Sequence, residues 1–199
     1  MSGPRAKLRV MSEPPVPLPP ASPQSAEPPV PPGPPVPPVP PVLPADRSGP
    51  FWDYLAGRVP PAPAAATLGW TLRRVDAERG EIEIGFTARE EFANPLGSVQ
   101  GGFLAAMLDD TLGPALATTL EPDQFAVTLD LNVSYLRPAA PGPVTGTGRV
   151  VHRGGSIAFL AGELRNAAGE VLATATATAR IIRPAPGLLA SAAPGPGAS

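Results

Sequence analysis

The sequence contains no cysteine, one histidine and one lysine among its 199 residues. Without cysteine there is no disulfide, no thiolate nucleophile and no cysteine-based metal site. A metal site would have to rely on carboxylates, because His152 stands alone. The net charge of −2 provides none of the basic surface that nucleic-acid binding requires. The composition therefore argues against thiol chemistry, histidine-rich metal sites and nucleic-acid binding.

Long hydrophobic runs are also missing. No uninterrupted apolar segment approaches the ~18–20 residues that a membrane-spanning helix needs. The basic residues Arg5, Lys7 and Arg9 are followed by prolines and not by the apolar core of a secretory signal. We therefore expect a cytoplasmic protein with no membrane partner.

Proline is abundant but unevenly distributed, with 17 of the 32 prolines between Pro14 and Pro44. Proline has no backbone N–H and favours the extended polyproline conformation. We expect residues 1–49 to be a disordered proline-rich tail, residues 50–183 to fold as one domain, and residues 184–199 to be a second disordered tail. The first tail is either a loose extension or a ligand for an aromatic groove on a partner protein.

Hydrophobic periodicity predicts the elements of the folded part. A short helix is expected at 51–57 and one long, largely buried helix from 101 to about 120. Alternating apolar residues predict six strands, at 68–75, 81–88, 127–135, 144–152, 156–166 and 170–183. A single apolar helix among so many strands predicts an α+β fold in which the sheet wraps the helix.

The most informative segment is the loop that leads into this helix, Asn94-Pro-Leu-Gly-Ser-Val-Gln-Gly-Gly102, followed by Asp109. Free N–H groups at a helix start favour negative charge. Asp109 lies seven residues after Gly102, about two helical turns, so both project from roughly the same side. Amide donors and a carboxylate can polarise and attack a carbonyl. We expect at least one of the adjacent acids Asp109 and Asp110 to lie near the core or an interface, and Asp110 to be the one that faces solvent or acts as a capping partner.

This pattern, Asn94-x-x-Gly97-x-x-Gln100-Gly101-Gly102 with the acid that follows, resembles that of the PaaI-type hotdog-fold acyl-CoA thioesterases. The strand ending in Tyr135-Leu-Arg-Pro138 is similar to theirs as well. The resemblance covers roughly residues 51–183. It implies a curved antiparallel β-sheet around one long central helix. It also implies hydrolysis of an acyl-CoA thioester to a carboxylic acid and free CoA, without a metal or redox cofactor.

The same resemblance implies a role for individual residues. Asp109 is the nucleophile or the base that activates water, and the Gly101 amide points at the thioester carbonyl. Asn94 holds the attacking water or fixes the loop, and Thr128 assists with its hydroxyl. In the family the asparagine and the acid come from opposite subunits, which implies a homodimer or homotetramer. Gln100 replaces the more common histidine, and it can position a carbonyl or cap the helix but cannot carry a proton at neutral pH.

The substrate contacts are less sharply defined. We expect Gly102, Arg137 and Arg153 to bind substrate. Arginine is well suited to binding the phosphates of CoA, and Arg149 is a further candidate for this role. An aromatic or medium-chain acyl group would fit a pocket lined by Phe92, Phe103 and Met107. Two other functions stay open at this stage. Gln100 is compatible with a hotdog protein that binds acyl-CoA without cleaving it, and the proline-rich segment is compatible with an interaction protein.

Overall fold

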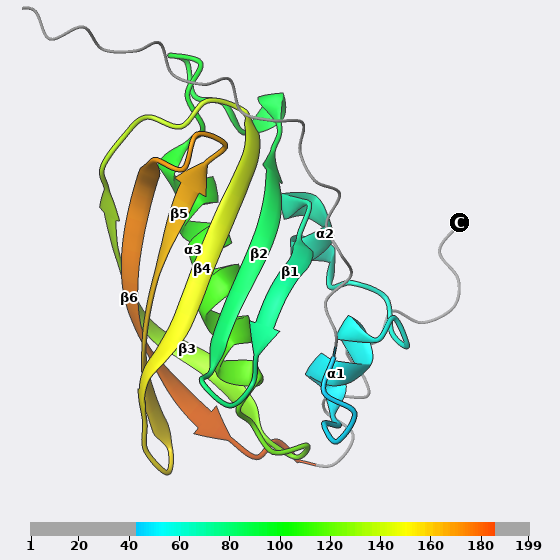
Figure 1. Ribbon diagram of the computed structural model, residues 1–199. Helices are drawn as coiled ribbons and strands as arrows, with labels where there is room; N and C mark the ends of the chain where they lie inside the picture. Colours follow the sequence, from blue (N-terminus) through cyan, green and yellow to red (C-terminus); the bar gives the residue numbers. More distant parts are fainter. Residues whose placement is uncertain (1–42, 186–199) are drawn as a thin grey trace, which may run out of the picture. The chain divides into compact units, whose positions relative to one another are not determined.

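A computed structural model describes residues 43–185 of the chain, so nearly all of the two predicted tails lies outside the described residues. Six antiparallel strands form one sheet in the order β1-β2-β4-β5-β6-β3. Their bounds are β1 Thr71–Asp76, β2 Glu81–Ala88, β3 Phe125–Tyr135, β4 Gly142–Arg153, β5 Ile157–Asn166 and β6 Val171–Ile182. The long helix α3 (Gly101–Ala117) packs across one face of the sheet (Figure 1). The predicted hotdog architecture is thus confirmed.

Helix α3 forms the centre of the core. Its buried residues recur at helical spacing and face the sheet: Leu104, Met107, Leu108, Thr111, Leu112, Ala115 and Leu116. The opposite side carries Gly102, Ala106 and Asp109, which are exposed. The helix runs through Pro114 and ends at Ala117, three residues before the predicted end. None of the helices in residues 43–185 is long and apolar enough to cross a membrane.

Glycines in β4 and β5 allow the helix to lie close to the sheet. A Cβ atom on Gly148 would come within 3.0 Å of Thr111, and one on Gly162 within 2.9 Å of Leu112. Both distances are tighter than ordinary van der Waals contact, so a side chain at either position would force its neighbours on α3 to shift.

Two short helices precede the sheet, α1 (Pro50–Leu55) and α2 (Pro63–Leu68), and a 3-10 turn, η1 (Glu90–Phe92), follows β2. The sequence predicts α1 but not α2, and it places Leu68 in a strand. Pro63 lies in the first turn of α2, where its missing N–H costs nothing. Three alanines follow, and Gly69 ends the helix in the left-handed conformation with a φ of 67°. The first strand therefore begins only at Thr71.

Strand β3 lies at the edge of the sheet and pairs only with β6. It is eleven residues long, and its large apolar side chains are unusually open. The exposed fractions are 47% for Phe125, 43% for Val127, 58% for Leu129 and 53% for Tyr135. A long edge strand with exposed apolar side chains offers free backbone groups for pairing with another chain.

Candidate functional site

Asp109 lies on the exposed side of α3 that faces away from the sheet, two turns after the helix begins. On β3, the Thr128 hydroxyl donates a hydrogen bond of 2.9 Å to the Oδ1 atom of Asp109. This bond turns the carboxylate toward the edge strand. Asp109 is exposed in the single chain, so it does not lie in the core.

One of the two acids does lie away from the surface, as expected, but it is Asp110, so the expectation that Asp110 faces solvent is wrong. Its Oδ2 atom is buried and has no hydrogen-bond partner among the described residues. Burial first, and the charge of Asp109 second, raise the pKa of Asp110 to about 6. The reason is that Trp70 and Tyr54, the latter on α1, lie beside Asp110. Trp70 donates its indole N–H to the Asp110 carbonyl at 3.0 Å, and the rings of Trp70 and Tyr54 lie 5.3 Å apart.

The loop before α3 is held by Asn94. Its Oδ1 atom accepts hydrogen bonds from the N–H groups of Leu96, at 2.9 Å, and Ser98, at 3.3 Å. Gly97 closes the same turn with a φ of 79°, which other residues rarely adopt. Of the two roles expected for Asn94, this geometry corresponds to fixing the loop.

The start of α3 leaves several polar groups available. Gln100 precedes the helix and is exposed, and its side chain makes no capping bond, so of the two roles open to it only positioning the carbonyl stays a prediction. Its backbone makes two hydrogen bonds. The Gln100 N–H donates to the Phe92 carbonyl at 2.7 Å, and the Gln100 carbonyl accepts from the Phe103 N–H at 2.9 Å. The N–H groups of Gly101 and Gly102 have no partner outside the helix within residues 43–185. These amides are the free donors that a helix start provides.

The distance between these donors and Asp109 limits what one chain can do. Asp109 follows Gly101 by eight residues, which is about 12 Å along a helix axis. Attack on a carbonyl needs the base and the amide donor each within about 3 Å of the reacting atoms. Gly101 and Asp109 of the same chain are therefore too far apart to act on one thioester.

The arginines expected at the substrate have protein partners. Arg137 donates to the Val171 carbonyl at 2.8 Å and lies 3.9 Å from a Glu170 oxygen. Arg153 donates to the Thr119 carbonyl and, at 2.9 Å, to the Gln124 side chain. Thr119 follows the end of α3, so Arg153 lies at the opposite end of the helix from Gly101. Within one chain the structure does not bring Arg153 to the helix start.

The aromatic residues expected to line an acyl pocket belong mainly to the core. Met107 has no exposed surface, and Phe92 is 3% exposed. Phe92 and Phe103 stack with their ring centroids 4.1 Å apart. Within one chain these residues therefore form no open pocket, and an acyl pocket lined by them stays a prediction.

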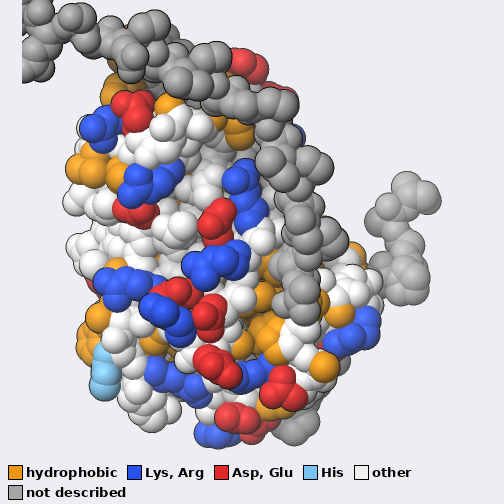
Figure 2. Space-filling model, in the orientation of Figure 1, with side chains coloured by type: hydrophobic (Ala, Val, Ile, Leu, Met, Phe, Trp, Pro, Cys, Tyr) orange, Lys and Arg blue, Asp and Glu red, His pale blue; other side chains and the backbone are white. Residues whose placement is uncertain are grey.

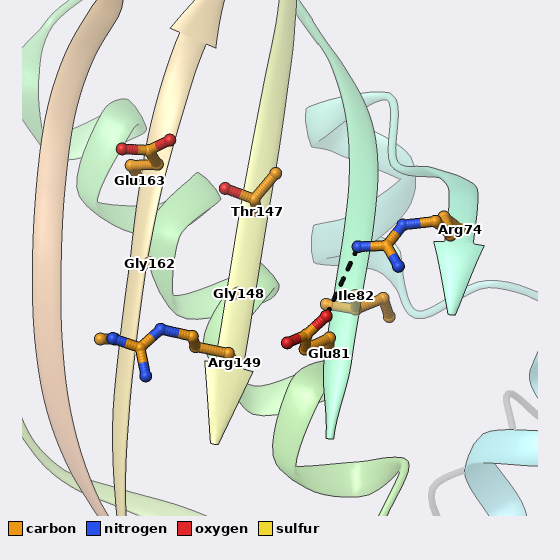
Figure 3. A pocket seen from close by; sticks show the side chains of 9 residues that line it. Arg74, Glu81, Ile82, Thr147, Gly148, Arg149, Gly162 and Glu163 are labelled. Atoms are coloured by element: carbon orange, nitrogen blue, oxygen red, sulfur yellow. Dashed lines mark ion pairs between the residues drawn. The ribbon is translucent and has the colours of Figure 1, made fainter. Parts of the chain in front are cut away.

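A shallow hollow lies on the other face of the sheet, away from α3. Figure 2 shows this face covered by interspersed basic and acidic side chains. In the hollow, Arg74 and Glu81 form an ion pair of 3.7 Å beside Arg149 (Figure 3). Its charges are largely balanced, and it contains neither Asp109 nor the helix start. Arg149, a further candidate for binding CoA, lies here rather than beside Asp109.

Comparison with known proteins adds the family. The model of the thioesterase superfamily matches residues 96–173. Human acyl-coenzyme A thioesterase 13 is 32% identical over 101 residues, which cover 50% of this chain and 71% of that protein. The solved structure of a phenylacetic acid degradation-related protein from Ralstonia eutropha JMP134 is 43% identical, covering 65% of this chain and 98% of its own, with a TM-score of 0.64. The E. coli PaaI protein is 22% identical, covers 66% of this chain and 93% of its own, and shares the fold with a TM-score of 0.59.

Proposed function

Because the chain belongs to the thioesterase superfamily, as a thioester hydrolase of the PaaI type, we propose that its substrate is an acyl-coenzyme A. Its products are then a carboxylic acid and free coenzyme A. One observation carries this proposal: an exposed carboxylate, held in place by Thr128, on a helix whose first amides are free. The name of the human relative supports the choice of coenzyme A as the carrier.

In the proposed reaction Asp109 acts as a general base. It takes a proton from water while the water oxygen attacks the thioester carbon, and the carbon–sulfur bond then breaks. The Gly101 amide donates to the carbonyl oxygen as that oxygen becomes negative. Thiols have pKa values near 8.5, so the sulfur leaves as a thiolate that solvent protonates. Gln100 therefore does not need to supply a proton. Direct attack by the Asp109 carboxylate is the second route open to the same residue.

The proposed site is shared between two copies of the chain. The separation of Gly101 and Asp109 along α3 supports this arrangement, as does the exposed edge strand β3. One copy would provide Asn94, Gln100 and Gly101, and the other would provide Asp109 with Thr128. We propose a homodimer, or a homotetramer built from such dimers.

The second candidate function is an acyl-CoA-binding protein that does not hydrolyse its ligand. Gln100 favours it, because the side chain of glutamine cannot transfer a proton at neutral pH. The domain bounds at 50 and 183, the cytoplasmic location, and the preference for an aromatic or medium-chain acyl group stay predictions.

A thiol-release assay with the full chain separates the two functions. Aryl-, medium-chain and long-chain acyl-CoA are offered in turn, and free thiol is followed over time while binding is measured calorimetrically. Release that increases with enzyme concentration supports the hydrolase. Tight binding of acyl-CoA without release supports the binding protein, and neither binding nor release contradicts both.

A further inference from the structure

Tyr135, the last residue of β3, contacts the start of α3. Its phenolic O–H donates a hydrogen bond of 2.9 Å to the carbonyl oxygen of Gly101. The ring also lies against the backbone, since a Cβ atom added to Gly101 would lie 3.2 Å from the ring carbon Cζ. The helix start is thus fixed by a polar contact and a steric one, and both come from the same side chain.

The bonded carbonyl belongs to the peptide that joins Gly101 to Gly102. A peptide unit is planar, so fixing its C=O also fixes the direction of its N–H, which is the N–H of Gly102. In a helix this N–H points back past the helix start. A hydrogen bond to a C=O also polarises the N–H of the same peptide and makes it a better donor. Tyr135 therefore acts on one of the two amides that have no partner outside the helix.

We propose that Tyr135 is a positioning residue that orients the Gly101–Gly102 peptide, so that the Gly102 N–H becomes a second donor to the thioester oxygen beside the Gly101 N–H. This inference rests on the proposed function, because it concerns the same helix start. Tyr135 does not belong to the loop-to-helix motif. It reaches the helix start because it is the last residue of the edge strand β3.

The two contacts explain why the positioning of the Gly101–Gly102 peptide requires a tyrosine at 135. Phenylalanine would keep the ring against Gly101 and lose only the bond to the carbonyl. Smaller residues would lose the packing as well. In the proposed dimer, one β3 strand then contacts the acid of one site through Thr128 and the helix start of the other site through Tyr135.

The kinetic test is Tyr135→Phe in the full chain. We expect kcat for acyl-CoA to fall about three- to tenfold, with KM changed less than about twofold, because the lost bond acts on a donor used mainly in the transition state. The matched control is Tyr54→Phe, the same chemical change at the only other tyrosine, which should leave kcat unaltered. An unchanged kcat in Tyr135→Phe, or a change confined to KM, overturns the inference.

A second readout does not depend on activity. In proton–nitrogen correlation spectra, Tyr135→Phe should move the Gly102 amide proton upfield, and Tyr54→Phe should not. An unmoved Gly102 resonance overturns the inference even if kcat falls, because the loss would then have another cause. If the wild-type chain releases no thiol from any acyl-CoA, the proposed function fails, and the spectra still decide whether Tyr135 orients this peptide.

Discussion

Thr128 and Asp109 are joined across the open side of the molecule. The hydroxyl of Thr128, on the edge strand, donates to the Asp109 carboxylate on the central helix at 2.9 Å. A carboxylate on an exposed helix face is normally free to rotate through several rotamers. This bond selects one of them and makes the position of the acid depend on β3. Whatever contacts the edge strand will therefore also affect the carboxylate.

Replacing the acid tests the proposed chemistry directly. Asp109→Asn keeps the shape of the side chain and removes its ability to accept a proton from water. We expect kcat/KM for acyl-CoA to fall about 10²- to 10⁴-fold, the range for loss of a general base. The melting temperature should stay close to that of the wild type, because Asp109 is exposed. Asp123→Asn, an exposed acid paired with Arg183, is the matched control and should keep full turnover. Full turnover by Asp109→Asn would remove the residue from the mechanism.

The hydroxyl that holds the acid can be tested by a pair of substitutions. Thr128→Ser keeps the hydroxyl and should retain most of the activity. Thr128→Val keeps the branched shape and loses the donor, so we expect kcat to fall about 3- to 30-fold, as for a hydrogen bond to a charged group in a partly solvated site. Steady-state kinetics of the two variants decides this. Equal rates for serine and valine would show that the hydroxyl has no role in turnover.

The buried acid predicts how stability changes with pH. The folded-state pKa of Asp110, about 6, lies above its ordinary value of 3.8, so the folded protein holds this proton more tightly than the unfolded chain. Stability is then greatest below pH 4 for this group and is lost as pH rises from about 4 to about 6. One pKa unit corresponds to about 1.4 kcal/mol, and the partial exposure of the side chain reduces the total to about 1–2 kcal/mol.

Asp110→Asn should therefore raise the melting temperature at pH 8 by about 2–6 °C and have no such effect near pH 4. The titratable groups that face this acid are Asp109 on its own helix and Tyr54 on α1, whose pKa is raised by burial and by the Asp110 charge. Unfolding followed by tryptophan fluorescence is well suited, since Trp70 contacts this turn of the helix. His152→Gln controls for the only histidine. An equal effect of Asp110→Asn at pH 4 and pH 8 would rule out this account.

A shared site predicts complementation between inactive variants. If Asn94 and Asp109 come from opposite subunits, a mixed dimer of Asn94→Ala and Asp109→Asn contains one intact site. Random mixing of subunits should then restore about a quarter of wild-type activity, because half of the dimers are mixed and each has one working site of two. Co-expression with two affinity tags isolates the mixed dimer, which by itself should show about half of wild-type activity. Activity no greater than that of the separate variants would place the whole site in one chain.

The sequence predicts the fold well because period-2 and helical patterns depend only on burial. The β3 strand, for example, alternates clearly enough to be found within two residues of its observed start. The short helix α2 is missed because its three alanines carry no pattern, and only Pro63 and Gly69 signal its ends. Local turn chemistry, not hydrophobic periodicity, would have found it.

The site is predicted less completely, because contacts between distant segments leave little trace in a sequence. Asp109 and Asp110 are neighbours, and the local sequence does not predict which of them will be buried beside Trp70 and Tyr54. The Tyr135 bond to Gly101 joins residues 34 positions apart. Similarly, Arg153 looks free in the sequence, although the helix end and Gln124 bind its guanidinium group. In each case the deciding partner comes from another element of the fold.

The glycines beneath α3 have a consequence for any redesign of this protein. Gly148 and Gly162 set how near the helix sits to the sheet, and larger residues there would push the helix outward. Such a shift would carry Asp109 away from Thr128 and break their hydrogen bond. Substitutions meant to accommodate a bulkier acyl group should therefore keep Gly148 and Gly162 and be made on the solvent side of the helix, where Gly102 and Ala106 are exposed.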